Sequence, residues 1–385
     1  MKKVLLLNHN QENFGTYYRC LFLAKGLSKS GYKVVMSCAS GKKFDLLVRS
    51  KKIDDNLTII TLPRIKYHKY FTGQILRLFI SIFQVLFFDY DICYAFTVAQ
   101  PQIGFPAWVA KRVRKKKLIV DWDDLWGGGF SVEHSGLVAK VLSWSERYFI
   151  KSADKITYVS EFIGSEIDKL NLKVEKVKIP NGANTDQIKI LDKIDSRKKL
   201  GLEPDKKYLV SIGNTYTDSM GIMLSTFEKI IAITPDVFLV LVGEGEIPEK
   251  FRPLFKKVER NVILAGRQPF ANIPLYLAVS DCLLLPMDDN GIEKARFPMR
   301  LGDYLCAGRP IASNAVGEVK YYLEKYKSGL TSPARDDLAL VGNIQKIIND
   351  DPLAKEIGEN ARSLAEGELN WTVINCKLAN IFNVL

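Results

Sequence analysis

Histidine and cysteine are scarce in this 385-residue chain, and their positions give no support to a zinc site or a disulfide framework. The three histidines, His9, His68 and His134, are far apart in the sequence. None of the six cysteines forms a Cys-x-x-Cys pair, and most lie in apolar stretches such as 281–285. We therefore expect reduced, buried thiols in a protein of a reducing compartment.

Long hydrophobic runs are also missing. The most apolar stretch, 71–88, is interrupted at helical spacing by polar residues such as Gln74 and Arg77, whereas a membrane-spanning helix needs about 20 mostly apolar residues. We expect an amphipathic helix that packs on a sheet, with contact to a membrane surface as the alternative. Only four apolar residues separate Met1-Lys2-Lys3 from Asn8, so the sequence predicts no secretory signal peptide.

Negative charge is in deficit. Lys and Arg number 55 and Asp and Glu 43, which gives a formal net charge of +12. Such a surplus attracts nucleic acid, anionic lipid or phosphorylated small molecules without choosing among them. No nucleic-acid binding module accompanies the basic run 111–117, so we expect no nucleic-acid partner. The run, with Lys66, Lys69 and Arg77, predicts either a solvated face or peripheral contact with an anionic membrane.

Short apolar runs alternate with helical patterns along the whole chain. Such alternation is typical of an open, doubly wound α/β sheet. A polar, lysine-rich stretch at 185–206 interrupts it, which predicts a first domain over 1–184, a linker, and a second domain over 207–370. Because ligands of parallel sheets bind outside the carboxyl ends of the strands, we expect two facing domains with a cleft between them.

A glycine, Gly15, stands between the first predicted strand and the first predicted helix, and Thr16 is the predicted N-cap of that helix. A glycine at this place lets the backbone approach a ligand, and a helix N-terminus favours an anionic phosphate. There is no Gly-x-Gly-x-x-Gly motif here, so a dinucleotide site is not indicated. The alternative is a glycine that only the turn requires.

Three carboxylates, Asp121, Asp123 and Asp124, follow a predicted buried strand and precede Trp126 and three glycines. They must be hydrated, paired with cations or partly protonated. Alternate strand positions share a side, so we expect Asp121 and Asp123 to point together and Asp124 away. The pattern suits a hydroxyl-binding or acid/base site with Trp126 as a sugar platform, an Asp-x-Asp site for Mg²⁺ or Mn²⁺, or a structural turn.

A loop and helix at 293–310 carry a third candidate site. Arg296 and Arg300 lie near the predicted helix N-terminus, where both would reinforce phosphate binding. Asp303, one turn further, is placed to accept hydrogen bonds from a ribose diol. A charged amphipathic helix without a ligand is the alternative.

Taken in order, these segments resemble the retaining glycosyltransferases of family four, which have the GT-B architecture. The resemblance covers nearly the whole chain. It includes the glycine loop at 14–16, Val120–Trp126, the sequence Ala-Asp-Lys-Ile-Thr-Tyr-Val-Ser-Glu at 153–161, Ile-Pro-Asn-Gly-Ala-Asn at 179–184, the stretch 240–245, and Asp303–Pro310.

The resemblance implies transfer of a sugar, with retention, from a nucleotide diphosphate sugar to a hydroxyl acceptor such as a glycan, a glycolipid or a lipid-linked saccharide. It implies no metal and no cofactor besides that co-substrate, a cytoplasmic location, and a C-terminal helix at 371–385 packed toward the first domain. The implied catalytic pair is Asp123 and Asp124. The implied acceptor residues are Thr16, Arg19 and Trp126. The implied donor-binding residues are Gly15, Gly213, Asn214, Arg267, Gln268, Glu293, Arg296, Phe297, Met299, Arg300 and Asp303.

The chain departs from the family pattern where the charges matter most. The usual catalytic histidine falls on Asp123, and the usual Arg and Lys beside the diphosphate fall on Asn214 and Met220. The first of two paired glutamates becomes Ala295, with Glu293 nearby, and Pro298 removes one backbone N–H. A diphosphate leaving group needs an opposing cation, so we expect Arg300 to supply it. Two alternatives follow: a weakly active or inactive nucleotide-sugar-binding scaffold, or a metal-dependent transferase of the opposite architecture that uses Asp121 and Asp123.

Overall fold

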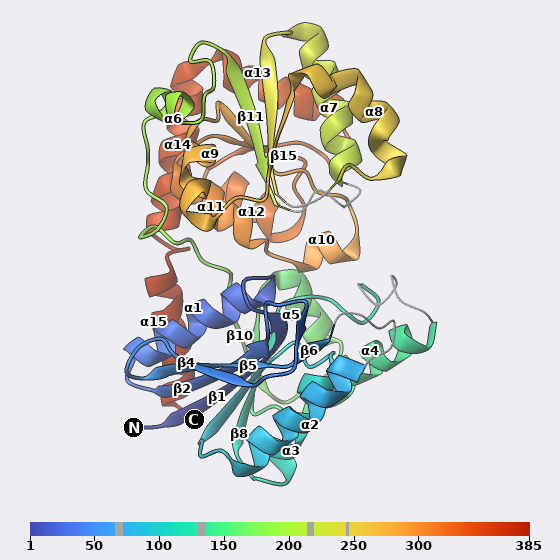
Figure 1. The fold of residues 1–385 in the computed structure, drawn as a ribbon, viewed down its shortest axis with the longest axis vertical. Helices are drawn as coiled ribbons and strands as arrows, with labels where there is room; N and C mark the ends of the chain where they lie inside the picture. Colours follow the sequence, from blue (N-terminus) through green and yellow to red (C-terminus); the bar gives the residue numbers. More distant parts are fainter. Residues whose placement is uncertain (66–71, 130–135, 214–218, 244–245) are drawn as a thin grey trace. The chain divides into compact units, whose positions relative to one another are not determined.

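The computed structural model describes residues 1–65, 72–129, 136–213, 219–243 and 246–385, and these divide into two compact units. The first unit comprises Met1–Asn181 and Trp371–Leu385, and the second comprises Gly182–Asn370. Each unit is built on one main sheet of mostly parallel strands with helices on both faces (Figure 1). The prediction of two doubly wound α/β domains is therefore confirmed.

The main sheet of the first unit has eight described strands in the order β10-β9-β8-β7-β1-β2-β5-β4. All neighbours pair in parallel except β4 and β5, and β3 and β6 form a separate antiparallel pair. The strands of the two sheets of the first unit are β1 (Lys3–Gln11), β2 (Lys33–Ala39), β3 (Phe44–Asp45), β4 (Arg49–Lys52), β5 (Leu57–Leu62), β6 (Arg64–Ile65), β7 (Ile92–Phe96), β8 (Lys117–Trp122), β9 (Lys155–Tyr158) and β10 (Glu175–Lys178). The apolar run Val4–Leu7 of β1 is buried, as a central strand covered on both faces requires.

The helices of the first unit include one from the far end of the chain. They are α1 (Thr16–Lys29), α2 (Thr72–Phe87), α3 (Pro101–Arg112), α4 (Gly136–Phe149), η2 (Ile150–Ser152), α5 (Glu161–Asp168) and α15 (Trp371–Asn383). Helix α15 packs on α1, where Phe22 stacks on Trp371 at a centroid distance of 5.0 Å. A Cβ on Gly26 would lie 2.0 Å from Cγ of Asn375, so only glycine permits this approach of the two helices.

Helix α2 packs with polar residues inward. Ser81 and Gln84 are buried, and the Ser37 hydroxyl donates to Gln84 Oε1 at 3.0 Å. The residues that face outward are large and apolar and are spaced by four: Ile75, Phe79, Phe83 and Phe87. The helix predicted over 71–88 is present from 72 to 87, but the expectation that its apolar side packs on the sheet is wrong for these four residues.

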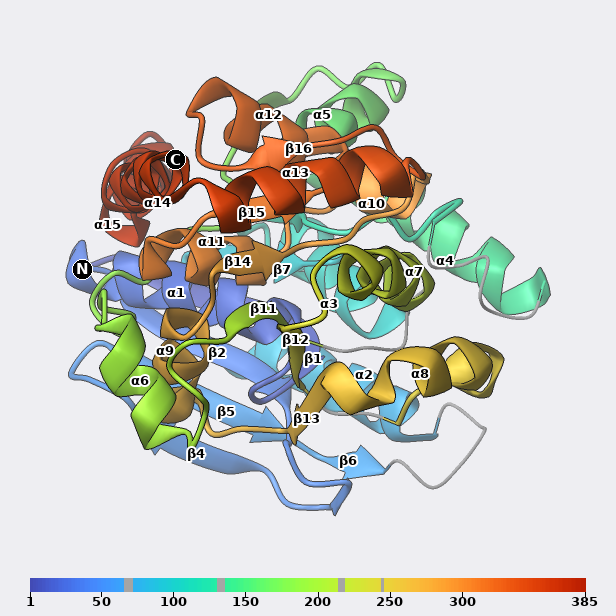
Figure 2. The same ribbon diagram turned by 90° about the horizontal axis from the view of Figure 1, so that it is seen from above.

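The sheet of the second unit has six described strands in the order β13-β12-β11-β14-β15-β16, all parallel. They are β11 (Lys207–Ile212), β12 (Val237–Val242), β13 (Val262–Gly266), β14 (Cys282–Leu284), β15 (Ile311–Ser313) and β16 (Leu330–Thr331). The helices are α6 (Lys193–Lys199), α7 (Ser219–Ile233), η3 (Glu249–Phe251), α8 (Arg252–Val258), η4 (Glu259–Asn261), η5 (Phe270–Asn272), α9 (Ile273–Ala278), α10 (Gly291–Ala295), α11 (Met299–Ala307), α12 (Gly317–Lys325), α13 (Asp337–Asn349) and α14 (Asp351–Glu366). Figure 2 shows them from above.

Residues 185–206, predicted to be a linker, belong to the second unit and are anchored in it. They carry α6, whose Arg197 is buried and donates from Nη2 to Asp281 Oδ2 at 2.6 Å. Two further hydrogen bonds run from the same guanidinium to the carbonyl of Val279. The lysine-rich composition therefore reflects a solvated helix with one buried cation rather than an independent segment.

Each sheet reverses its direction of winding at one point. In the first unit the chain builds outward from β1 on one side and from β7 on the other. In the second unit the corresponding pair is β11 and β14. Ligands of open parallel sheets bind at such switch points, outside the carboxyl ends of the strands. The fold thus marks one place in each unit for a site.

Two predictions about composition are tested by the fold. Five of the six cysteines are buried, as expected, while Cys376 of α15 is exposed. Among the residues that the structure describes, no helix is both long enough and apolar enough to cross a membrane.

Candidate active site

The carboxylate of Asp123 lies at the switch point of the first unit and is held by two hydroxyls. Thr16, the first residue of α1, donates to Oδ2 at 2.7 Å, and Thr97, just after β7, donates to Oδ1 at 2.7 Å. Burial raises the pKa of Asp123, and the nearby charge of Asp121 adds to the effect. Thr16 is therefore not the N-cap that the sequence predicts, since its hydroxyl serves Asp123 and Gly15 occupies the capping position.

Asp121 forms a buried ion pair with Arg19. Nε and Nη2 of Arg19 donate to the two carboxylate oxygens at 2.8 and 2.9 Å, and Nη1 donates to Asn181 Oδ1 at 3.0 Å. Tyr94 and Thr157 also donate to Oδ2 of Asp121. The guanidinium is 1% exposed, so the prediction that Arg19 contacts an acceptor is wrong. Arg19 instead neutralises Asp121.

The same contacts contradict the Asp-x-Asp metal alternative. Both oxygens of Asp121 are taken by Arg19, and both oxygens of Asp123 accept threonine hydroxyls. Two separate parallel sheets also differ from the opposite architecture that this alternative requires. The carboxylate pair is therefore built into the protein rather than arranged to bind a cation.

A cavity of about 730 Å³ opens beside this pair, within the first unit. Its lining includes four of the residues that the sequence singles out: Gly15, Thr16, Asp124 and Trp126. Gly15 adopts φ +55° and ψ −131°, and a Cβ there would lie 2.8 Å from Nδ2 of Asn10. The loop after β1 therefore requires glycine to keep its path along the cavity.

Two residues of this site carry no sequence signal. Glu146 of α4 accepts the backbone N–H groups of Trp126 and Gly127 at 3.1 and 2.6 Å, and its burial raises its pKa to about 7. His9 lines the cavity and meets the Trp126 ring edge-to-face at 5.9 Å. Burial lowers the pKa of His9 to about 3, so the imidazole is neutral. Its Nδ1 is buried without a hydrogen-bond partner.

Arg300 lies at the switch point of the second unit. A Cβ on Gly213, which follows β11 with φ +121°, would lie 3.2 Å from Arg300 Nη1. That nitrogen also donates to the carbonyl of Ile212 at 3.3 Å. Tyr304, one turn along α11, accepts from the N–H of Ile212 and donates to the carbonyl of Leu284, which ties β11 to β14. Among the described residues Arg300 forms no ion pair with a carboxylate.

The other predicted donor-binding residues of α10 and α11 lie near Arg300, and they differ in burial and in hydrogen bonding. Glu293 accepts from Arg296 Nη2 at 2.5 Å, while its second carboxylate oxygen is buried without a partner. Burial raises the pKa of Glu293. Phe297 is buried against Tyr322, and Met299 begins α11. Arg296 is thus already paired, which leaves Arg300 as the unpaired cation of this group.

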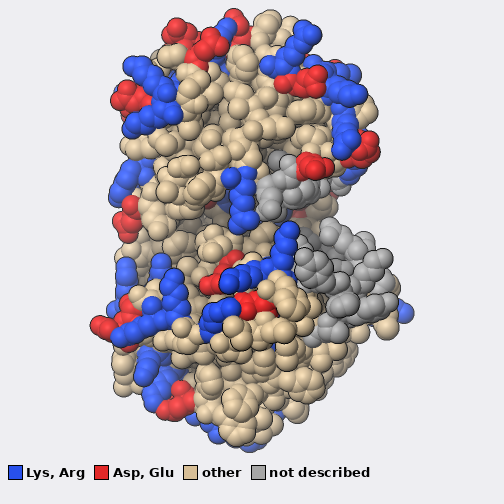
Figure 3. Space-filling view, in the orientation of Figure 1, with Lys and Arg blue, Asp and Glu red and all other residues tan. Residues whose placement is uncertain are grey.

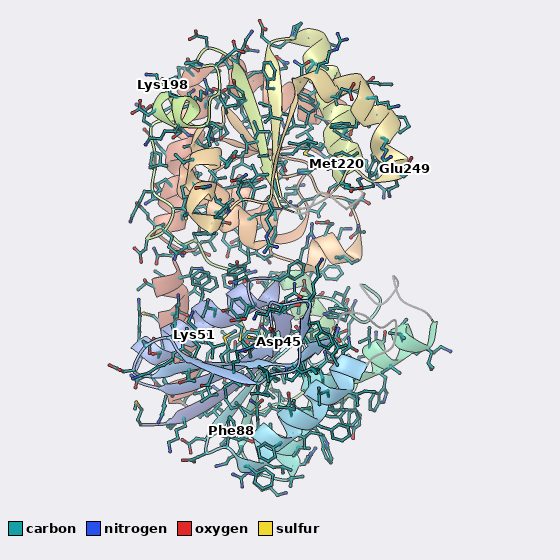
Figure 4. All side chains as sticks on the ribbon, in the orientation of Figure 1. Asp45, Lys51, Phe88, Lys198, Met220 and Glu249 are labelled. Atoms are coloured by element: carbon teal, nitrogen blue, oxygen red, sulfur yellow. The ribbon has the colours of Figure 1, made fainter. Side chains whose placement is uncertain are left out.

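Asp303 lies on α11, one turn after Arg300, and burial raises its pKa to about 7. Arg267 follows β13 and is exposed, while the Gln268 amide donates to the carbonyl of Ala265 at 2.7 Å. Asn214 lies outside the described residues. Met220, labelled in Figure 4, belongs to the hydrophobic core of the second unit. The position at which the family carries a lysine is therefore used here for packing.

Comparison with known proteins agrees with both units. Residues 15–182 match the model of the glycosyl transferase 4-like domain, and residues 192–364 match that of the glycosyl transferases group 1. The chain belongs to this glycosyltransferase family. Its fold is GT-B: sucrose-phosphate synthase from Thermosynechococcus elongatus superposes with a TM-score of 0.78 at 17% identity and covers 100% of this chain and 99% of that one.

Curated relatives match at higher sequence identity but over a smaller part of the chain. An uncharacterized glycosyltransferase of Methanocaldococcus jannaschii is 25% identical over 58% of this chain and 59% of its own length. A GDP-mannose-dependent mannosyltransferase of monoacylated phosphatidylinositol monomannoside from Corynebacterium glutamicum is 24% identical over 74% of both chains. The chain spans between half and two thirds of the length of the first two curated relatives it matches, 59% and 56%.

Proposed function

We propose that the protein transfers a hexose, with retention of configuration, from a nucleotide diphosphate sugar to a hydroxyl acceptor. The observation that carries the proposal is Arg300, whose guanidinium lies at the carboxyl end of β11 beside a glycine and forms no ion pair with any described residue. A diphosphate leaving group gains charge in the transition state, and a preorganised cation in a partly buried site stabilises that charge. Gly213 keeps the space next to this cation free of a side chain.

Asp303 would bind the ribose of the same donor. Its carboxyl on α11 forms no ion pair with another described residue, and an ionised carboxylate accepts hydrogen bonds from two neighbouring hydroxyls. Arg267 and Gln268, after the edge strand β13, would lie near the base. Arg296 would support the diphosphate indirectly, because its charge is shared with Glu293.

The cavity of the first unit would hold the acceptor. Asp124, Trp126 and Thr16 line it, and the Thr16 hydroxyl donates a hydrogen bond to Asp123 behind the wall. These carboxylates would orient hydroxyl groups of the acceptor or of the donor sugar. In the family that this chain resembles, the leaving phosphate receives the acceptor proton. We therefore assign Asp123 an orienting role and not that of a base.

An inactive scaffold that binds nucleotide sugars is the second candidate, favoured by the burial of Met220 in the core. Slow hydrolysis of the donor separates the two. An enzyme releases nucleoside diphosphate from its nucleotide sugar even without acceptor, whereas a scaffold binds the sugar and releases none.

A panel of intact UDP, GDP, ADP and dTDP sugars in a thermal-shift experiment tests donor binding first. A ligand that binds the native state raises its melting temperature, and at a hundredfold excess over the dissociation constant it adds about 2.7 kcal/mol of stability. The donor found in this way is then assayed for hydrolysis and transfer, with and without chelator. No stabilisation by any of the four sugars would contradict the proposal.

Peripheral contact with the cytoplasmic face of a membrane is the location that we infer. Four large apolar residues of α2 face outward, and the basic run 111–117 extends from the last turn of α3 to the first residue of β8 in the same unit. In Figure 3 the first unit is largely free of charged side chains over α2 and α3. An apolar stripe with basic residues in the same unit is typical of a surface that binds anionic lipid.

A further inference from the structure

The cavity of the first unit is more apolar than the binding of a sugar hydroxyl requires. One helix on each side supplies aliphatic side chains to its lining. From α2 and α4 these are Ile75, Leu78, Leu137, Val138, Val141 and Leu142. A saccharide presents hydroxyl groups in almost every direction, so a wall without hydrogen-bond partners would desolvate them at a cost. A hydrocarbon chain gains free energy from the same wall.

Two arginines border the same cavity without carboxylate partners. Arg77 of α2 donates from Nη1 to the carbonyl of Pro63 at 3.1 Å, and its Nε is buried without a partner. Within the described ranges, Arg64 of β6 donates from Nη1 to the carbonyl of Gly41 at a long distance, 3.3 Å. Among the described residues, neither forms an ion pair with Asp or Glu.

The two guanidiniums also repel each other. The pKa of Arg77 falls to about 10 because the side chain is buried and because the charge of Arg64 lies nearby. Burial lowers the pKa of Arg64 as well. Two cations that share a cavity with no counter-ion are stabilised by an anion that binds both, and a phosphate matches the planar donors of arginine.

The outer face of α2 continues the apolar wall away from the cavity. Ile75 lines the cavity and is also half exposed, and Phe79, Phe83 and Phe87 follow it at intervals of one helical turn. Phe83 and Phe87 contact each other with ring centroids 4.7 Å apart. Figure 4 labels Phe88, just beyond this end of the helix. The apolar side chains thus form a path from the cavity to the protein surface.

We propose that this cavity binds a lipid-linked acceptor that carries a phosphate next to a hydrocarbon chain. The phosphate binds Arg64 and Arg77, the chain lies between α2 and α4 and leaves along the exposed face of α2, and the acceptor hydroxyl lies at Thr16 and Asp124. This inference rests on the proposed function and narrows its acceptor to one chemical class.

Direct binding of a simple probe tests the proposal without any transfer assay. Dodecyl phosphate is titrated below its micelle concentration, with calorimetry as the readout, beside inorganic phosphate and an uncharged dodecyl glycoside. We expect dodecyl phosphate to bind at least tenfold more tightly than either control, because only it has both the chain and the anion. The proposal would be overturned if dodecyl phosphate and the dodecyl glycoside bound with equal affinity, or if dodecyl phosphate did not bind.

Three variants locate the probe. Arg77→Gln and Arg64→Gln remove one cation each, and Val141→Asp places a charge in the hydrocarbon wall, where Val141 is 41% exposed and the substitution is tolerable for folding. We expect each to weaken dodecyl phosphate at least tenfold. Leu338→Asp, on α13 of the second unit and 71% exposed, is the matched control and leaves the affinity unchanged. If all three variants bind as the wild type does, the assigned cavity is wrong.

Donor binding separates this inference from the proposed function. The nucleotide-sugar affinity of each variant is measured in parallel and confirms that the second unit is folded. If the protein binds the donor but not dodecyl phosphate, the proposed function stands and the proposal of a lipid-linked acceptor is wrong. If the protein binds dodecyl phosphate at this cavity but neither binds nor hydrolyses any nucleotide sugar, the lipid site stands. The proposed transferase activity is then wrong.

Discussion

The guanidinium of Arg300 lies directly against Gly213, although the two residues are far apart in the chain. A methyl group at Gly213 would come within 3.2 Å of Arg300 Nη1. The contact places a cation without a carboxylate partner in the described part of the chain at the point where the second sheet reverses its winding, which is where parallel sheets bind their ligands. The family usually carries Arg and Lys elsewhere for this purpose, and we propose that Arg300 of α11 supplies their charge here.

Substitution of Arg300 by Ala is expected to lower both donor affinity and turnover. Loss of one group that stabilises developing negative charge costs roughly 10²–10³ in kcat. The measurement is the rate of nucleoside diphosphate release, together with the dissociation constant of the intact donor. Arg252→Ala, an exposed arginine of α8 paired with Glu249, is the control and should behave as wild type. If Arg300→Ala turned over as fast as the wild type, Arg300 would not be the group that stabilises the leaving diphosphate.

Donor affinity is expected to rise with pH through the titration of Asp303. Its pKa is raised to about 7, so the carboxyl is mostly protonated at pH 6 and mostly ionised at pH 8. Only the ionised form accepts hydrogen bonds from both ribose hydroxyls, so the affinity should increase up to about tenfold over this range. An intact nucleotide sugar is used because its diphosphate keeps its charge. The variant Asp303→Asn should bind the donor weakly, with the same dissociation constant at every pH. If its affinity depended on pH as steeply as that of the wild type, Asp303 would not be the titrating group.

Removal of Arg19 is expected to destabilise the first unit strongly. The variant would leave Asp121 fully buried without its cationic partner, and breaking a buried pair from one side costs about 3–5 kcal/mol. All five tryptophans of the chain lie in the first unit, so urea unfolding followed by tryptophan fluorescence reports on that unit. The double variant Arg19→Met with Asp121→Leu should recover part of the loss. A single variant as stable as the wild type would contradict the buried ion pair.

Replacement of Gly15 by Ala is expected to impair the cavity more than the fold. The residue has φ +55°, and the new methyl group would meet Asn10 Nδ2 at 2.8 Å. A positive φ is rarely adopted by a residue with a side chain and costs it on the order of 1–3 kcal/mol. Gly128→Ala, with φ +82° and open space around it, carries similar strain without a clash and is the matched control. We expect transfer to fall at least about tenfold further in Gly15→Ala than in the control, and equal rates in the two variants would show that only strain matters.

The exposed aromatic residues of α2 are expected to bind anionic vesicles. The double variant Phe79→Ser with Phe83→Ser should lower the fraction that sediments with phosphatidylglycerol vesicles by at least about tenfold, because each ring contributes apolar area to the contact. Leu338→Ser on α13 is the control. No sedimentation of the wild type at low salt would disprove the membrane contact.

The amino-acid sequence determined the class of fold and the order of its parts. Apolar runs such as Val4–Leu7 and the restart of the pattern at β11 depend on local periodicity, which a single chain displays without any knowledge of contacts. Gly15 and the α11 segment were visible for the same reason, since a glycine after a buried strand and cations at a helix start are local features.

Only the tertiary structure decided which charges are free. Arg19 and Arg300 are both cations near a predicted site, yet Arg19 meets a carboxylate from β8, whereas Arg300 meets a backbone carbonyl and a glycine. The same holds for α2, which turns Ser81 and Gln84 toward the sheet and its phenylalanines outward. His9 joins the site through a contact with Trp126, more than a hundred residues away in the sequence, and Glu146 through the backbone of Gly127 in a separate loop. Pairing between distant side chains has no periodicity, so it is set by packing and not by local pattern.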